Sequence, residues 1–170
     1  MKSFSIFFIL PFVVQAVVIA LDEWVFHVKR GLPRWERIGH PIDTASLLIC
    51  FGFLLLVPFS GSALKWYGAL AVLSCLLVTK DEWVHKEVCP ASEQWLHALL
   101  FLNHPIVLTT AGLIWWRMGD LNAPAWLISF VPPIEWAHTL LWGQVAAITL
   151  FLCYQIIYWN FLWKPKNVSP

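Results

Sequence analysis

Five long apolar stretches, separated by short polar clusters, constrain the fold of this chain more than any other feature. They run from about Phe4 to Leu21, Ile42 to Val57, Ala63 to Val78, Trp95 to Trp116 and Trp136 to Trp163. A bilayer core of about 30 Å is crossed by roughly 20 apolar residues in a helix, and 59% of the 170 residues are hydrophobic. The sequence therefore predicts an all-α integral membrane protein with about five transmembrane helices, in a single domain over residues 1–170.

The distribution of basic residues predicts how this domain is oriented. With five spans, one membrane face receives most of the basic residues: Lys29, Arg30, Arg34, Arg37, Lys80, Lys86, Lys164 and Lys166. Cytoplasmic loops carry the excess of Lys and Arg, so we expect this face and the C-terminus to be cytoplasmic and the N-terminus outside, in the inner membrane of a bacterium. The formal net charge of +1 offers no basic surface for nucleic acid.

Two short motifs occur twice along the chain. Asp22-Glu23-Trp24 returns as Asp81-Glu82-Trp83, and His40-Pro41-Ile42 returns as His104-Pro105-Ile106. This predicts an internal repeat of residues 4–58 and 62–117, in which one helix pair is used twice in parallel orientation, as in parallel-repeat transporter folds.

Local signals predict where helices end. Gly31 is a suitable residue to follow the first helix, and Pro33 blocks its continuation while opening a short helix through Ile38. Gly39 and Asn103 tolerate helix-ending conformations and each precedes His-Pro, so we expect breaks at His40 and His104. A broken fourth helix would imply a polar pocket near His104, whereas the alternative is an ordinary proline kink.

After the fourth helix, the sequence predicts two further segments. Residues 123–133 are too short to span and should be interfacial or re-entrant, and residues 136–163 form the fifth helix.

Five histidines follow a carboxylate by three or four residues, which places acid and imidazole on one helix face. The pairs are Glu23/His27, Glu36/His40, Glu82/His85, Glu93/His97 and Glu135/His138. In so apolar a chain, a desolvated carboxylate costs several kcal/mol unless it is paired or bound to a metal. Mixed carboxylate and imidazole ligands suit first-row metals.

Topology and repeat together predict one ligand cluster on the cytoplasmic side. The candidate metal ligands are Glu23, His27, Glu36, His40, Asp81, Glu82, His85, Glu93, His97 and His104. Further candidates, as ligands or as acceptors that orient the imidazoles, are Asp22, Asp43, Glu135 and His138. Glu135 and His138 would begin the fifth helix on the opposite membrane face, where a Glu in the first helical turn is explained by ordinary helix-capping electrostatics. A salt-bridge network with Arg30, Arg34, Arg37 and Lys86 is the alternative reading of the acids. Cys89, in the cytoplasmic loop, is a further possible soft ligand.

The size of this set predicts two metal ions, iron first, with zinc or manganese as alternatives. The spacings Glu82-x-x-His85 and Glu135-x-x-His138 each resemble the Glu-x-x-His half-site of di-iron carboxylate helix bundles. We therefore expect an oxidoreductase that catalyses a reaction similar to those of hydroxylases or desaturases. Its substrate would be lipophilic, and it could act with a redox partner or as an oligomer. Alternatives are a divalent-metal or proton transporter, a haem-binding protein, a structural membrane module and a zinc hydrolase.

Overall fold

The computed structural model describes residues 8–80, 82, 89–120, 122–131 and 133–164. Every regular element within these ranges is helical. In chain order the elements are α1 (Leu10–Leu21), the π-helical turn η2 (Asp22–His27), α2 (Val28–Arg30), α3 (Arg34–Leu56), α4 (Gly61–Leu77), α6 (Ala91–Gly119), α7 (Ala125–Phe130), α8 (Ile134–Ile157) and the π-helical turn η3 (Tyr158–Leu162).

Four helical stretches are long and apolar enough to cross a membrane: Leu10–Arg30, Arg34–Leu56, Ala91–Gly119 and Ile134–Leu162. The apolar helix Gly61–Leu77 has 17 residues, about 25 Å at 1.5 Å per residue, and is slightly short of a full crossing. The predicted all-α membrane protein is confirmed, with these four candidate spans and one shorter apolar helix.

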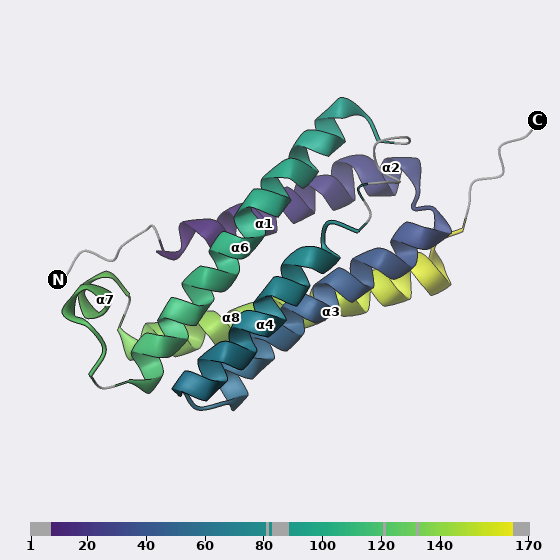
Figure 1. Ribbon diagram of the computed structural model, residues 1–170. Helices are drawn as coiled ribbons and strands as arrows, with labels where there is room; N and C mark the ends of the chain where they lie inside the picture. The colour runs from purple at the N-terminus through teal and green to yellow at the C-terminus, as the bar shows by residue number, and fades with distance from the viewer. Residues whose placement is uncertain (1–7, 81, 83–88, 121, 132, 165–170) are drawn as a thin grey trace, which may run out of the picture.

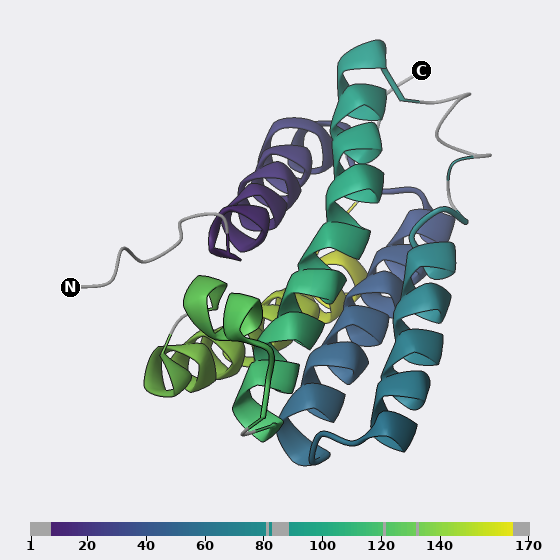
Figure 2. The same cartoon turned by 60° about the vertical axis from the view of Figure 1, so that its left-hand side comes forward.

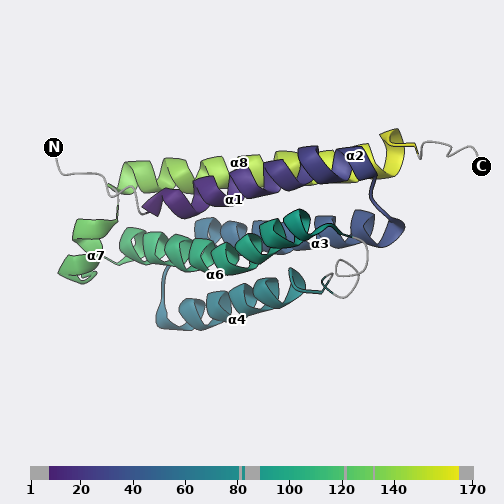
Figure 3. The same ribbon diagram turned by 90° about the horizontal axis from the view of Figure 1, so that it is seen from above.

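The long helices run roughly along one direction and form a bundle (Figures 1 and 3). α3 lies between α8 and α4 and packs on both, while α1 packs chiefly on α6. The short helix α7 lies at one end of the bundle and α2 at the other (Figure 3). Turning the molecule shows α4 beside α3 on the flank away from α1 (Figure 2).

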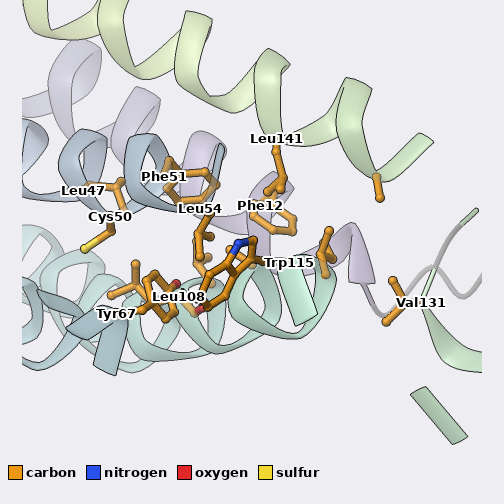
Figure 4. Close-up of a cluster of buried hydrophobic side chains, with 14 of the residues drawn as sticks. Phe12, Leu47, Cys50, Phe51, Leu54, Tyr67, Leu108, Trp115, Val131 and Leu141 are labelled. Atoms are coloured by element: carbon orange, nitrogen blue, oxygen red, sulfur yellow. Dashed lines mark hydrogen bonds between the residues drawn. The ribbon is translucent and has the colours of Figure 1, made fainter. Parts of the chain in front are cut away.

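A continuous apolar core holds these helices together. Figure 4 shows Phe51 and Leu54 of α3 close to Tyr67 of α4 and to Leu108 and Trp115 of α6. All five are at most 5% exposed. Polar groups in this core are paired: the Tyr67 hydroxyl donates to the Leu108 carbonyl over 2.6 Å, and Trp115 Nε1 donates to the Val57 carbonyl over 2.9 Å. These bonds tie α6 to its neighbours where an unpaired polar atom would be costly.

Gly31 ends the first helix, as predicted. Its φ of 79° and ψ of 153° lie in a region that is essentially restricted to glycine. A Cβ built on this residue would lie 2.5 Å from Cζ2 of Trp163. The turn therefore brings α2 and the start of α3 against the end of the last helix.

We expect Gly31→Ala to lower the free energy of unfolding by about 1–3 kcal/mol, because alanine must adopt a strained backbone conformation and displace the Trp163 ring. Thermal unfolding in detergent measures this. Gly143→Ala is the matched control, since a Cβ on that helical glycine meets nothing within 4 Å. Equal unfolding midpoints for the two variants would contradict the prediction.

The predicted helix breaks at His40 and His104 are wrong. α3 continues through Pro41 and α6 through Pro105, so the helix opened by Pro33 is not short and the fourth long helix is not broken. A proline removes only one intrahelical hydrogen bond. In apolar surroundings the turns on both sides remain helical, because open backbone there would leave more polar groups unsatisfied.

Segment 123–133 contains α7, which at six residues is far too short to span. Its Leu127 is fully buried in the core. Whether the segment lies at the membrane interface stays a prediction, as does the internal repeat. The predicted fifth helix corresponds to α8 with η3.

Candidate metal centre

The π-helical turn η2 brings two carboxylates to one imidazole. The backbone N–H of Val28, the residue after this turn, donates to the carbonyl of Glu23, five residues earlier in the chain. This wider turn lets His27 meet both acids: Nδ1 lies 3.2 Å from Glu23 Oε2, and Nε2 lies 3.2 Å from Asp22 Oδ2. Single π-turns within helices are frequent at functional sites. All three residues are at most 5% exposed.

Helix α6 contributes a third carboxylate and a second imidazole from its first turns. Glu93 is fully buried and His97 is 3% exposed. Glu93 Oε1 lies 3.5 Å from His27 Nε2, and His97 Nε2 lies 3.3 Å from Asp22 Oδ1. Asp22 therefore joins the imidazoles of two helices that are far apart in the sequence.

Helix α3 adds Glu36 and His40, which lie one turn apart. Glu36 is fully buried, and the rings of His40 and His27 are 4.9 Å apart between centroids. His27 thus lies between the α6 residues and the α3 residues.

The donor atoms form two groups that could each hold a metal ion. The first consists of Asp22, His27, Glu93 and His97, and the second of His27, Glu36 and His40. Within each group the ligand atoms all lie within 4.8 Å of one another. In the described part of the chain, Glu93 Oε2 is buried and makes no hydrogen bond, and Asp22 Oδ1 and His27 Nε2 make the ion-pair contacts given above but no hydrogen bond. Buried polar atoms of this kind need an explanation, and an ion is one.

Arg30 provides part of the predicted salt-bridge network. Its Nη2 donates to Glu93 Oε1 over 2.7 Å and to Glu36 Oε2 over 3.3 Å. Arg37 instead donates to the Leu32 carbonyl and lies over the Trp163 ring, 4.9 Å from its centroid. Arg34 is exposed, and Lys86 lies outside the described residues. One guanidinium therefore serves two of the four buried carboxylates.

Glu23 is fixed from the opposite side by the last helix. Its Oε1 accepts hydrogen bonds from the Tyr154 hydroxyl over 2.7 Å and from Trp159 Nε1 over 2.8 Å. Its Oε2 faces His27. A carboxylate held in this way orients the imidazole beside it. The sequence alone gave no signal for Tyr154 and Trp159, because neither lies near an acid in the chain.

A cavity of about 100 Å³ adjoins the cluster. Asp22, Glu23, His27, His40, His97 and His104 all line it. The pocket predicted near His104 is therefore present, although the helix break from which it was inferred is absent. His104 lies outside both metal groups; its Nε2 is 2.9 Å from Ser74 Oγ, which is 2.8 Å from Ser46 Oγ.

The remaining candidates are distributed as follows. Asp43 lines the same cavity and forms an ion pair with Lys80 over 2.6 Å. Glu82 lies within the described residues, is half-buried, and belongs to neither group of metal ligands. Asp81 and His85 lie outside the described residues. Glu135 and His138 are exposed at the start of α8, whereas the cluster contacts the far end of that helix.

Cys89 lies beside Arg30 Nη2, at 3.7 Å from its sulfur, and is not in either metal group. Burial, together with the negative charge of Glu93, raises the pKa of its thiol to about 12. We expect N-ethylmaleimide to modify Cys89 at least tenfold more slowly at pH 7.5 than in the denatured protein, because the thiolate is the reactive form. Peptide-resolved mass spectrometry measures this, and labelling as fast as in the denatured chain would contradict it.

No protein-family model, curated protein or solved structure matches this chain.

Proposed function

We propose that this chain is a membrane metalloenzyme with two metal ions bound by the buried cluster. His27 is shared by the two groups of ligand atoms, and this sharing is the observation that carries the proposal. One ion would be held by Asp22, His27, Glu93 and His97. The other would be held by Glu36, His40 and the other ring nitrogen of His27, whose imidazole would have to be fully deprotonated to serve both ions, with positions left for water or a reactant.

The charge of the cluster supports a bound cation. Asp22, Glu23 and Glu93 are each at most 5% exposed, and the partners of Glu93 among the described residues include the guanidinium of Arg30 at 2.7 Å and the imidazole of His27 at 3.5 Å. Burying more negative than positive charge costs several kcal/mol. Divalent or trivalent ions would offset this cost.

We propose iron as the metal, with zinc and manganese as alternatives. Carboxylate and imidazole ligands without thiolate suit iron in more than one oxidation state and are compatible with dioxygen chemistry. Cys89 has a raised pKa and lies outside both groups, so a thiolate-rich zinc site has no support here.

We propose oxidation of a lipophilic substrate as the reaction. In a hydroxylation, one oxygen atom of dioxygen is inserted into a C–H bond, and the other leaves as water after taking up two protons and two electrons. The electrons would come from a redox partner. The cytoplasmic orientation expected from the basic residues would give such a partner access to this end of the bundle.

Elemental analysis of protein purified without chelators or affinity-tag metal tests the proposal. We expect about two metal ions per chain, and iron should give visible absorption that changes on reduction. The matched control is His138→Ala, which alters an exposed histidine at the start of α8 and should leave both ions in place.

A folded protein without stoichiometric metal would overturn the proposal in favour of an ion-pair network around Arg30. A Soret band would instead indicate haem. Metal flux into vesicles containing the purified protein would indicate transport.

A further inference from the structure

A second, larger cavity of about 320 Å³ lies beside the candidate metal centre. Its inner wall is formed by the buried residues Phe12, Leu47, Phe51 and Val107 from α1, α3 and α6. Such a volume is within the range of small-molecule sites, which are predominantly apolar with a few polar groups.

The mouth of this cavity lies between α1 and α8. Ala16 and Trp24 on one side and Ala147 on the other line it and are exposed. α1 packs chiefly on α6, whereas α8 packs chiefly on α3. The two helices therefore do not pack on each other closely enough to close the opening between them. Since both belong to candidate membrane spans, the mouth opens sideways, toward lipid.

The inner end of the cavity reaches the candidate metal centre. Glu23, Gln15, Thr44 and Phe151 line both this cavity and the smaller one that contains the histidines. Glu23 contacts His27 through Oε2 while its Oε1 is held by Tyr154. A molecule in the larger cavity would therefore end beside the cluster.

The charges of the lining exclude one class of occupant. Among the described residues that line the larger cavity, none is Lys, Arg or His, and the charged side chain is Glu23. A phosphate or carboxylate headgroup would lose its hydration there and face a carboxylate, at a cost of several kcal/mol. Gln15, Thr44 and Gln144 offer neutral hydrogen-bonding groups.

We propose that this cavity is the substrate site, and that it takes the uncharged hydrocarbon part of a lipid, entering from the bilayer between α1 and α8. This rests on the proposed function and specifies its substrate class. The neutral end or chain of the substrate lies beside Glu23, and any anionic headgroup stays outside the mouth.

A photoreactive long-chain alcohol, with a diazirine in its chain, tests this in phospholipid vesicles that contain the purified protein. We expect its cross-links to concentrate in the peptides that contain Phe12 to Trp24 and Gln144 to Tyr154. Ala147→Trp should reduce them at least fivefold, because the indole fills the mouth. Ala146→Trp is the matched control, because Ala146 is exposed on the same helix but does not line the cavity; it should label like the unmodified protein.

Equal labelling in the two variants, or labelling spread over all lipid-facing peptides, would overturn the substrate site. Cross-linking of Glu23 by an alkyl phosphate whose diazirine lies next to the phosphate would overturn the exclusion of anionic groups. Metal content is measured in the same samples. If the unmodified protein retains metal but is not labelled at these peptides, this site alone is refuted. Absence of metal refutes the proposed function and leaves the labelling result to stand by itself.

Discussion

His27→Ala is expected to empty both metal positions, so that the metal content falls from about two ions per chain to less than about 0.3. The reason is geometric: His27 belongs to both groups of ligand atoms, and loss of one imidazole from a site with few protein ligands usually abolishes tight binding. His97→Ala and His40→Ala each alter one group. They should each leave about one ion per chain.

Elemental analysis of the three variants, purified side by side, measures this pattern. Far-ultraviolet circular dichroism and elution as a single species in detergent establish that each variant is folded. His138→Ala serves as the control for removing an imidazole. If His27→Ala lost no more metal than His97→Ala, the two positions would not share a ligand, and the dinuclear arrangement would be wrong.

The sequence predicted most of the residues of the buried cluster, but it did not predict how their side chains are arranged. The repeated acid and histidine spacings correctly singled out Glu23, His27, Glu36, His40, Glu93 and His97 as side chains that come together. They did so because a carboxylate and an imidazole four residues apart share a helix face whatever the helix packs against. Asp81 and His85 remain predictions, because they lie outside the described residues.

Asp22 shows where this reasoning fails. The sequence made Asp22 a candidate ligand or acceptor, but at 100° per residue it does not face His27. The π-helical turn changes the local period, and Asp22 then contacts both His27 and His97. Glu23 in this turn accepts hydrogen bonds from Tyr154 and Trp159 of the last helix, which are tertiary contacts that no local pattern encodes.

The predicted helix breaks at His40 and His104 were wrong for a related reason. Gly39-His40-Pro41 and Asn103-His104-Pro105 are helix-ending signals in water, but a membrane penalises open backbone. Asn103 uses its side-chain amide between helices instead: Nδ2 donates to the Pro11 carbonyl over 2.8 Å and to Gln15 Oε1 over 2.9 Å. Gly31 was predicted correctly because its conformation and the following Pro33 are local properties.

Arg30→Met is expected to separate the two explanations of the buried carboxylates. In metal-free protein it removes the cation 2.7 Å from Glu93. Breaking a buried ion pair costs about 3–5 kcal/mol. Since the Arg30 side chain is 26% exposed, water reduces this, and we expect a loss of about 2 kcal/mol, or about 4–8 °C in the unfolding midpoint.

Arg34→Met is the matched control, because Arg34 is exposed at the start of α3 and should change the stability by less than about 0.5 kcal/mol. Thermal unfolding of both variants in detergent, with and without added metal, gives the decisive comparison. A metal ion bound to Glu93 supplies the positive charge that the missing guanidinium no longer provides, so metal should at least halve the penalty of Arg30→Met. If Arg30 is instead the main counter-charge of the cluster, the penalty will be the same in both conditions, and the carboxylates belong to a structural ion-pair network.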